Sequence, residues 1–569
     1  VPDVVYPDGN RRILDFTIVP WPTWTFDAGD GNRVVQEILV DRAACATVLR
    51  WRRVAGQGPC TIEVRPLLSG RDHHALHHEN PAFDFASCTI GGNVVWRPYG
   101  GLPAITALTN AVWRADAEWF RNFLYVVEEQ RGMDVVEDLA SPGVFAWDLA
   151  REEAVMVLRM GDAPYARALP SAAAMMQAEA ARRAAFPTQL ARAGDAYLVD
   201  RGAGRTIIAG FPWFQDWGRD TFIAMRGLTL CTGRLDDAEA ILAAWSGVVS
   251  EGMLPNRFAD SGDTPLYNSV DASLWFVVAV HDFLAAAESA GRSVSNDVRE
   301  TLWRAVVAIL DGYRAGTRYG IRADDDMLIT AGEWGSQLTW MDAKQVDWVV
   351  TPRVGKAVEV QALWINALRI ASARDSRFAA MAEAATVSFR ARFPDSRTGG
   401  LFDVVDADHE RGKDDHRVRP NQIYAVGGLP FPIMEGDTAR GIVDLVERVL
   451  LTPMGLRSLS PDDPDYSPHY RGTPLQRDSA YHRGTVWPFL LGPFIEAWLR
   501  VHGDNDAPRA EARRRFVDPL LASMNTYGLG HICEVADGDP PHTPGGCPFQ
   551  AWSVGEMLRI EHLLSEPRP

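Results

Sequence analysis

The sequence contains no block of lysine or arginine and few long apolar runs. Its 57 basic residues are outnumbered by 74 acidic ones, which gives a formal net charge of −17 at pH 7. Dispersed positive charge argues against nucleic acid and anionic lipid as partners. No stretch is long and apolar enough to predict a membrane span. Neutral and cationic ligands remain open.

Cysteine is also scarce. The six cysteines form no CxxC pair and no dense framework, so we expect reduced thiols and no disulfide scaffold. The four histidines between positions 73 and 78 could pair at i, i+4, but their segment reads as β, which disfavours a metal site. No motif suggests a phosphate loop or a nucleophile elbow, so no cofactor is expected. Without a signal peptide, a cytoplasmic location is expected.

Tryptophan, in contrast, is abundant. The chain has 19 tryptophans in 569 residues, and many adjoin Gly, Asp or Arg instead of aliphatic residues. Flat indole faces beside polar groups suit a sugar ring, so these residues favour carbohydrate as the ligand. The length exceeds one ordinary core and predicts two domains. The oligomeric state is not indicated.

The first domain is expected over residues 1–165. Short alternating or apolar segments at 12–19, 46–51, 61–67 and 119–127, separated by Gly, Pro and Asn, predict an antiparallel β-sandwich. Residues 166–186 are then expected to hold a linker helix, because 171–185 is rich in Ala, Met, Glu and Arg and stops before Pro187.

Residues 187–569 are expected to be α-helical. Apolar periodicity predicts twelve helical segments, joined by loops that carry the Trp, Asp, Arg and His residues. Six inner and six outer helices with functional loops at one face describe an (α/α)6 toroid. The predicted segments are 187–199, 219–232, 235–249, 270–290, 294–316, 355–373, 375–393, 421–428, 436–451, 484–502, 507–525 and 549–564.

Residues 333–353 hold the strongest candidate for a catalytic acid. Asp342 lies among Trp340, Met341 and Ala343, surroundings that would desolvate a carboxyl group and raise its pKa. Glu333 and Asp347 compete for the same role. The structural alternative is a buried ion pair between Asp342 and Lys344.

Two further segments carry candidate substrate contacts. In residues 211–220, Arg219 could donate a hydrogen bond to one sugar hydroxyl and Asp220 could accept one from its neighbour. Trp217 could stack against the face of the same sugar ring. The alternative is that these residues form a helix cap with a salt bridge. In residues 254–275, Asn268 and Asp271 both precede a helix, and one of them is expected to be only its cap. Further candidates here are Asp216, Asn256, Arg257 and Tyr267.

The C-terminal part should supply the second carboxylate. Glu534 ends a short apolar segment and is the candidate base, with a structural ion pair as the alternative. Asp537 and Asp539 read as turn residues. His482 could bind a sugar hydroxyl or be structural. The triad Asp324 to Asp326 and the charged run from 406 to 419 read as solvated loops.

These segments, in this order, resemble the C-terminal domain of the amylo-α-1,6-glucosidases, the glycogen debranching enzyme family of bacterial and archaeal type. The matching motifs lie at 212–220, 254–256, 271–275, 338–343, 481–488 and 550–553. The β region resembles the N-terminal sandwich of the family without its first strands. The resemblance implies an (α/α)6 barrel and inverting cleavage of an α-glucosidic bond, with Asp342 as acid and Glu534 as base. It also implies that Arg219 and Asp220 contact the glucose. Remaining substrate contacts are expected at Trp340, Lys344, His482, Trp487, Gln550 and Trp552.

The chain departs from the family pattern beside the proposed acid. Gln345 and Val346 stand where Val-Gly is usual, Gln361 replaces a common Asn, and Gly546 replaces a common Arg. The first two positions could reshape the subsite for the leaving group, and with it the linkage specificity. The alternatives are a glucosidase for another small α-glucoside and a catalytically inactive glucan-binding protein.

Overall fold

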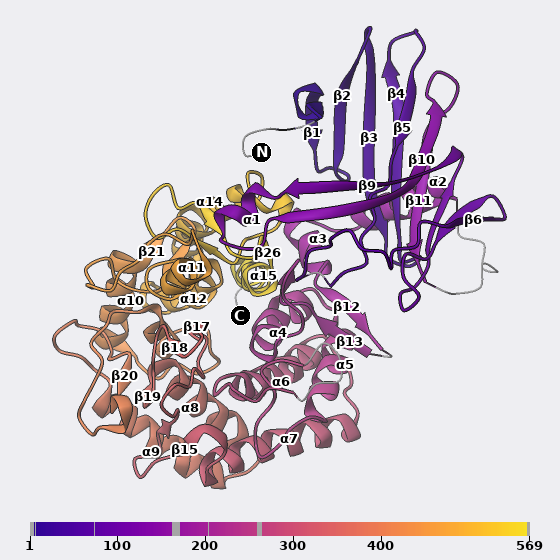
Figure 1. The fold of residues 1–569 in the computed structure, drawn as a ribbon. Coiled ribbons are helices and arrows are strands. Elements are labelled where there is room, and N and C mark those ends of the chain that lie inside the picture. The colour runs from indigo at the N-terminus through magenta and orange to yellow at the C-terminus, as the bar shows by residue number, and fades with distance from the viewer. Residues whose placement is uncertain are drawn as a thin grey trace. The chain divides into compact units, whose positions relative to one another are not determined.

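The chain folds as two compact units, Val1–Pro187 and Thr188–Pro569 (Figure 1). The computed structural model describes residues 5, 7–72, 74–161, 171–202, 204–258 and 265–565.

Unit 1 is built from two antiparallel sheets. In the larger sheet the spatial order is β1 (Ile13–Thr17), β2 (Thr23–Gly29), β3 (Asn32–Asp41), β4 (Ala46–Ala55), β11 (Ala154–Met160), β8 (Ile105–Thr109), β7 (Asn93–Trp96) and β6 (Ser87–Ile90). The smaller sheet has the order β5 (Thr61–Val64), β10 (Val136–Asp148) and β9 (Val112–Leu124). A short helix, α1 (Val126–Gln130), joins β9 to β10.

The larger sheet of unit 1 is covered on both faces. On one face Phe145 and Trp147 of β10 pack with Trp51 and Met156 in a common core, which makes the two sheets a sandwich. On the other face α2 (Ala172–Ala184) buries Met175 and Met176 against Val48 and neighbouring side chains. The helix expected as a linker is therefore part of the first unit, with Ser171 as its N-terminal cap.

Unit 2 is a ring of inner helical segments enclosed by outer ones. The inner segments contact each other in a closed cycle: α4 (Gly218–Met225) with η2 (Arg226–Leu230), α6 (Ala272–Ser289), α8 (Val358–Ser372), η5 (Pro420–Ala425), η6 (Pro488–Leu490) with α12 (Leu491–His502), and α15 (Ala551–Ser565). The outer segments are α3 (Gln189–Asp195), α5 (Leu235–Ser246), α7 (Asn296–Ala315), α9 (Arg377–Arg392), α10 (Gly436–Leu450), and α13 (Asp506–Ala512) with η7 (Arg513–Val517) and α14 (Asp518–Ser523). Each of the twelve predicted helical segments is present among the described residues, and together they form the expected (α/α)6 toroid (Figure 1).

Outer and inner helices differ in how much of their surface is apolar. Outer helix α7 buries Leu302, Val306, Ile309 and Tyr313 at helical spacing and exposes its other face. Inner helix α6 is surrounded by other helices, and it is long and apolar enough to pass a membrane-span test by length and composition. The expectation that no stretch is long and apolar enough for a membrane span is thus wrong. The physical reason is burial inside the ring, since 61% of this window is buried.

Short strands and one further helix shape the loops between the ring helices. The helix α11 (Pro474–Tyr481) was not predicted; it has a capping box formed by Thr473 and Gln476. The short pairs are β12 (Leu198–Arg201) with β13 (Gly204–Ile207), β14 (Gly210–Phe211) with β26 (Phe549–Gln550), β15 (Arg322–Ala323) with β16 (Ile329–Thr330), β17 (Lys344–Gln345) with β18 (Trp348–Val349), and β19 (Lys356–Ala357) with β20 (Val404–Val405). A five-stranded ladder runs in the order β21 (Leu451–Thr452), β22 (Gly455–Arg457), β23 (Val486–Trp487), β24 (Val535–Ala536) and β25 (Pro544–Gly545).

Two loops expected to be solvated are partly buried. The amino group of Lys356, itself buried, binds carboxylates of Asp324 (3.0 Å), Asp326 (2.8 Å) and Asp406 (3.1 Å). At the other end of the charged run, Arg419 is buried and donates to the backbone oxygens of Ser458 and His482. Charged residues were misjudged here because their partners lie on distant segments.

Candidate functional site

The predicted site residues meet at one end of the ring, where loops lead into inner helices. Arg219 and Asp220 begin α4, and Asp271 directly precedes α6. Glu534 directly precedes β24, and Gln550 ends β26 just before α15. Because these elements neighbour each other in the ring, residues more than three hundred positions apart come within hydrogen-bond reach.

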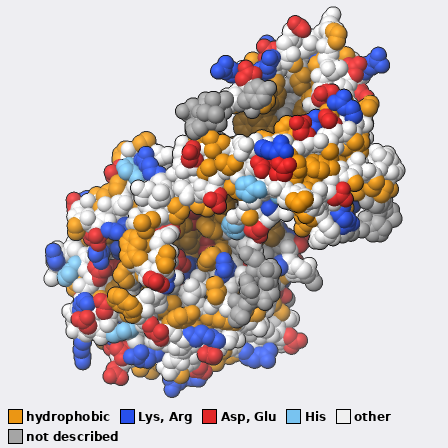
Figure 2. Space-filling view, in the orientation of Figure 1, with side chains coloured by type: hydrophobic (Ala, Val, Ile, Leu, Met, Phe, Trp, Pro, Cys, Tyr) orange, Lys and Arg blue, Asp and Glu red, His pale blue; other side chains and the backbone are white. Residues whose placement is uncertain are grey.

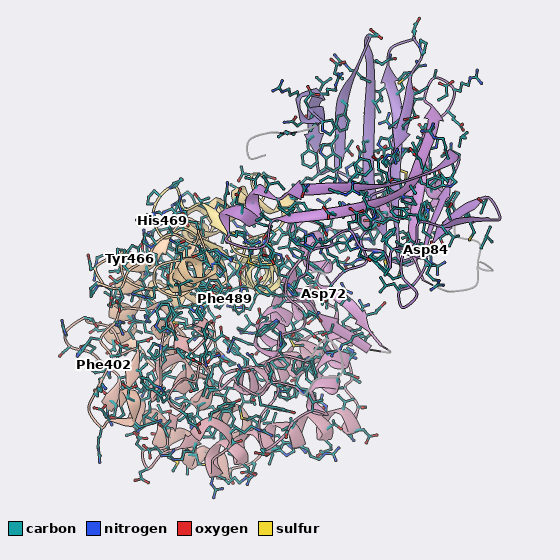
Figure 3. The ribbon with its side chains drawn as sticks, in the orientation of Figure 1. Asp72, Asp84, Phe402, Tyr466, His469 and Phe489 are labelled. Carbon is teal, nitrogen blue, oxygen red and sulfur yellow. The ribbon has the colours of Figure 1, made fainter. Side chains whose placement is uncertain are left out.

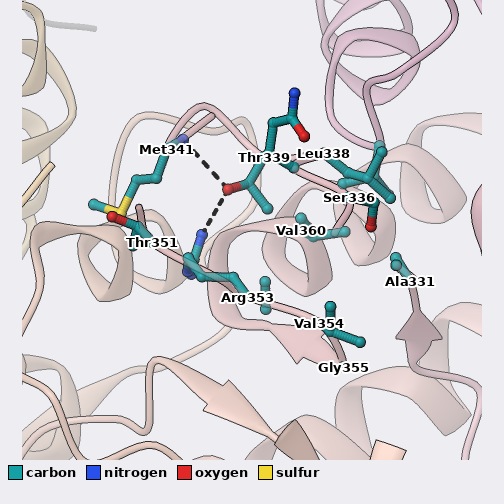
Figure 4. A pocket seen from close by; sticks show the side chains of 14 residues that line it. Ala331, Ser336, Leu338, Thr339, Met341, Thr351, Arg353, Val354, Gly355 and Val360 are labelled. Carbon is teal, nitrogen blue, oxygen red and sulfur yellow. Dashed lines mark hydrogen bonds between the residues drawn. The ribbon is translucent and has the colours of Figure 1, made fainter. Parts of the chain in front are cut away.

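Asp342 is held by Arg219. One guanidinium nitrogen of Arg219 donates to Asp342 Oδ2 at 3.0 Å. The loop behind Asp342 is fixed by Thr339, whose hydroxyl accepts from the Met341 amide (3.3 Å) and from Arg353 (3.2 Å), as Figure 4 shows. Asp342 is therefore a positioned carboxyl group, and no other described side chain donates to its second oxygen.

Desolvation governs the protonation of Asp342, although the side chain is only half-buried. Desolvation raises its pKa above the ordinary value, while the Arg219 charge and hydrogen bond act in the opposite direction, and desolvation prevails. The competing residues Glu333 and Asp347 are both exposed. The expected alternative of a Lys344 ion pair is wrong: the Lys344 amino group donates to the Gly335 carbonyl at 3.0 Å, and the cation beside Asp342 is Arg219.

Glu534 is held differently. Its Oε1 accepts a hydrogen bond from the Tyr481 hydroxyl, and its Oε2 accepts from the Cys547 amide at 2.8 Å. Desolvation raises the pKa of Glu534 to about 7, and the Asp342 charge adds to the rise, while both hydrogen bonds lower it. Among the described basic side chains, none forms an ion pair with Glu534, so the structural ion pair weighed as its alternative role is absent.

Asp220 adds a third carboxyl group, and it is buried. It accepts a hydrogen bond from Gln550 Nε2 at 3.3 Å. Desolvation raises the pKa of Asp220 to about 8; Arg219 lowers it, and the charges of Glu534 and Asp342 raise it further. Since the Asp342 charge also raises the pKa of Glu534, the three carboxyl groups lie in one electrostatic environment.

Arg219 and Asp271 form the rigid base of the site. The Arg219 Nε lies 2.9 Å from both oxygens of Asp271, and its third nitrogen donates to Ser269 at 3.3 Å. Either Asn268 or Asp271 was expected to cap α6, and Asp271 occupies its N-cap position. The Asp271 side chain makes no cap bond, however, because the Arg219 guanidinium binds both oxygens of the carboxylate. The Ser269 hydroxyl accepts from the Ala272 amide instead, at 3.1 Å.

An aromatic cluster backs the site. His482 stacks on Trp487 with ring centroids 5.2 Å apart, and Trp340 meets both rings edge-on. The indole nitrogens of Trp340 and Trp487 bind Asn421 and the Tyr481 carbonyl, and both side chains are buried. Phe489, labelled in Figure 3, stacks on Trp552 at 4.3 Å. These rings shape the site from behind, with little of the Trp340 and Trp487 faces exposed.

His482 is neutral in this setting. Burial lowers its pKa well below the ordinary value, and the nearby charges of Arg419, Arg219 and Arg353 act in the same direction. Within the described part of the chain, neither ring nitrogen has a hydrogen-bond partner.

The remaining candidate substrate contacts lie in the loops before α4 and α6. Asp216 is bound by Arg201 and by the Thr206 hydroxyl (3.1 Å), which ties it to the β12–β13 hairpin. Arg257 lies over the Trp217 ring, with its guanidinium carbon 5.6 Å from the centroid. The Tyr267 hydroxyl donates to Val248, and Arg318 covers its ring.

Several buried polar atoms at this end of the ring lack a hydrogen-bond partner among the described residues. Such atoms are costly unless a ligand or water satisfies them. They belong to Asn256, Arg257, Asn268, His482, Gln550 and Trp552. Across the described residues no group of three or more His, Cys, Asp or Glu side chains could hold a metal ion; His73 lies outside them. All six cysteines are free thiols.

Two residues of the site were not assigned from the sequence. Tyr481 orients Glu534, and Ser269 both binds Asp271 and caps α6. Each adjoins a residue that was singled out, His482 and Asp271, but nothing in the local pattern distinguishes a tyrosine or serine that will face a carboxylate from a distant segment.

Comparison with known proteins agrees with this architecture. Residues 192–559 match the family model of amylo-alpha-1,6-glucosidase, and residues 1–156 match that of the glycogen debranching enzyme N terminal domain. The glycogen debranching enzyme of Saccharomyces cerevisiae is 25% identical over 473 residues, which are 63% of this chain and 30% of that protein. A bacterial glucoamylase, solved in complex with acarbose, superimposes with a TM-score of 0.60 at 12% identity, covering 95% of this chain and 84% of that one.

The glucoamylase likeness supports the (α/α)6 fold alone, and the chain spans about a third of the length of the yeast relative. The first family model, in contrast, matches well over half of the residues and covers Arg219, Asp342 and Glu534. The chain belongs to the amylo-alpha-1,6-glucosidase family of glycoside hydrolases.

Proposed function

We propose that this protein is an inverting hydrolase of α-glucosidic bonds, and that its substrate is the α-1,6-linked branch glucose of glycogen or a limit dextrin. The observation that carries the proposal is the pair Asp342 and Glu534: a half-buried and a buried carboxyl group in one electrostatic environment, held by different partners. A pair of carboxyl groups is the minimum equipment for glycoside hydrolysis.

The two carboxyl groups take opposite roles. Asp342, whose pKa is raised and which Arg219 holds through one oxygen, donates its proton to the glycosidic oxygen as the bond to C1 breaks. Glu534 accepts hydrogen bonds at both oxygens, which favours its ionised form, and removes a proton from a water that attacks C1 from the other face. Inversion requires about 6.5–9.5 Å between the carboxyl groups to leave room for that water.

The substrate assignment draws on two kinds of support. Buried donors and acceptors without partners, at Asn256, Asn268, His482 and Gln550, suit the hydroxyl groups of a sugar ring. The yeast relative is a glycogen debranching enzyme, and the structurally similar glucoamylase binds acarbose.

The roles are tested by Asp342→Asn. Loss of the proton donor should lower kcat on a branched dextrin by about 10²–10⁴-fold, with glucose binding retained by calorimetry. Glu534→Gln should cause a comparable loss. Residual activity of Asp342→Asn above a tenth of wild type would remove Asp342 from the acid role.

The stereochemistry and linkage need a second experiment. Proton NMR at early times should show β-glucose as the first product from an α-linked substrate. Release of α-glucose would rule out inversion. Branched limit dextrin should be hydrolysed faster than maltose or an aryl α-glucoside, and the reverse order would favour the small-glucoside alternative.

A further inference from the structure

A second cleft lies in unit 2, beside the loop that carries Asp342. Its volume is about 790 Å³, which is within the range of ligand sites. Neither Asp342 nor Glu534, both described residues, lines it. Its walls come from residues 334–336 and 347–354, which flank Asp342 in the chain, and from the loops at 408–419, 465 and 483.

One wall presents Trp334 on a closed turn. Trp334 is fully exposed. The Ser336 hydroxyl closes the turn by accepting from the Glu333 amide and donating to the Glu333 carbonyl, both at 2.8 Å. Gly335, at φ +82°, permits the reversal. The turn therefore presents a large apolar ring to solvent from a fixed backbone.

A second tryptophan comes from the β17–β18 hairpin. Trp348 is 42% exposed and pairs with Gln345 across the hairpin. Lys344 on β17 donates to the Gly335 carbonyl at 3.0 Å, so the hairpin and the turn that carries Trp334 are tied together. Gln345 also hydrogen-bonds to Asp478 on α11, the helix that ends at Tyr481.

The lining of the cleft carries both signs of charge. Five carboxylates and four guanidinium groups line it, and two of the guanidinium groups, those of Arg353 and Arg419, are buried. Asp465 pairs with both Arg417 (2.8 Å) and Arg483 (2.9 Å), so part of the remaining charge is neutralised within the lining. Figure 2 shows the same interspersion of positive and negative side chains over the visible face of unit 2. A polyanion gains little here, whereas a neutral polyol finds both kinds of partner.

The exposed rings of Trp334 and Trp348 indicate what kind of ligand suits the cleft. Exposed aromatic rings rimmed by polar side chains are typical of ligand grooves. Together with a lining that offers both hydrogen-bond donors and acceptors, these rings favour a hydroxyl-rich ligand that has flat apolar faces.

We propose that the cleft binds a neutral α-glucan chain of several glucosyl units, stacked on Trp334 and Trp348, as a site separate from the catalytic carboxylates. This inference rests on the proposed function for its choice of an α-glucan over other polyols. Because the cleft adjoins the acid loop, a chain bound there is held close to the bond-cleaving residues, and the cleft selects polymer over small glucosides.

Direct binding tests the site without any need for turnover. Maltoheptaose is titrated into full-length Asp342→Asn protein, with and without Trp334→Ala and Trp348→Ala. The double alanine variant should raise Kd roughly 10-fold, and Trp334→Phe with Trp348→Phe should restore much of the affinity because an aromatic face is retained. Val387→Ala, an exposed apolar residue on outer helix α9, is the matched control and should not change Kd.

Kinetics separate this inference from the proposed function. In the otherwise wild-type protein, the double alanine variant should raise KM for branched dextrin about 10-fold, leaving kcat and the hydrolysis of a small α-glucoside unchanged. If the double alanine variant changes neither the KM for dextrin nor the Kd for maltoheptaose, the proposal that the cleft binds α-glucan is wrong. If maltoheptaose binding depends on the two tryptophans but the protein hydrolyses no glucoside, the glucan-binding proposal stands and the proposed function is refuted.

Discussion

At the scale of single residues, the protonation of the site depends on a few contacts. Glu534 is buried, and its pKa is raised to about 7 by desolvation, yet the Tyr481 hydroxyl and the Cys547 amide both act to lower it. The proposed base must be ionised to accept a proton from water. The acid limb of the pH profile should therefore fall near neutrality, where Glu534 becomes protonated as the pH drops.

Removing the Tyr481 hydroxyl should move that limb. Since the hydrogen bond lowers the pKa of Glu534, Tyr481→Phe should raise it and shift the acid limb of kcat/KM to higher pH by about one unit, because a bond to a charged group contributes about 1.5 kcal/mol. Tyr125→Phe, which loses a hydrogen bond to the Glu137 carboxylate in unit 1, is the control and should leave the limb in place. A limb that stays fixed or moves to lower pH in Tyr481→Phe would contradict the assigned role.

At the scale of elements, the β17–β18 hairpin stands out. Val346 at its tip has a left-handed backbone, φ +53°, and is 88% exposed. A β-branched residue rarely adopts this conformation, and the resembled family has Gly at this position. The hairpin is nonetheless held by the Lys344–Val349 pairing and by the bond from Gln345 to Asp478.

Val346→Gly should relieve this strain. We expect a gain of about 1 kcal/mol in the free energy of unfolding, after the greater chain entropy of unfolded glycine is subtracted. Urea unfolding monitored by tryptophan fluorescence measures it. Val346→Ala keeps a Cβ in the left-handed region and should gain little, so equal effects of the two substitutions would argue against backbone strain.

At the scale of the whole molecule, the ring of unit 2 closes where its first and last inner helices meet. A Cβ at Gly227 in η2 would lie 1.7 Å from the Gly555 carbonyl oxygen on α15, and a Cβ at Gly555 would lie 2.6 Å from the Ala224 oxygen. The β14–β26 pair and the Ala551 amide bond to Ala209 (2.8 Å) join the same two ends of the unit. Close backbone approach, which only glycine permits, is thus built into the closure.

Gly227→Ala should weaken this closure. Overpacking of this kind costs about 1–3 kcal/mol, and the urea midpoint of unit 2 should fall accordingly. Gly247→Ala at the end of α5, where the added Cβ meets only the Ala244 oxygen at 3.5 Å, is the control and should be close to neutral. A Gly227→Ala variant as stable as the control would show that the helices separate without cost.

The sequence by itself determined the division into a β unit and a helical unit, and the order of the twelve ring segments. Local periodicity marks the twelve helices of the ring because each buries one stripe or is buried all round, and the aromatic and acidic loops mark Asp342 and Glu534 as candidates. Helix α11 escaped detection because its eight residues bury only Arg477 and Ala480. Only the tertiary structure decided which side chains serve each other: Arg219 binds Asp342 and Asp271, Lys344 does not pair with Asp342, and Tyr481 orients Glu534. Such pairings join segments far apart in the chain, and their energies depend on burial and on distances that no local pattern contains.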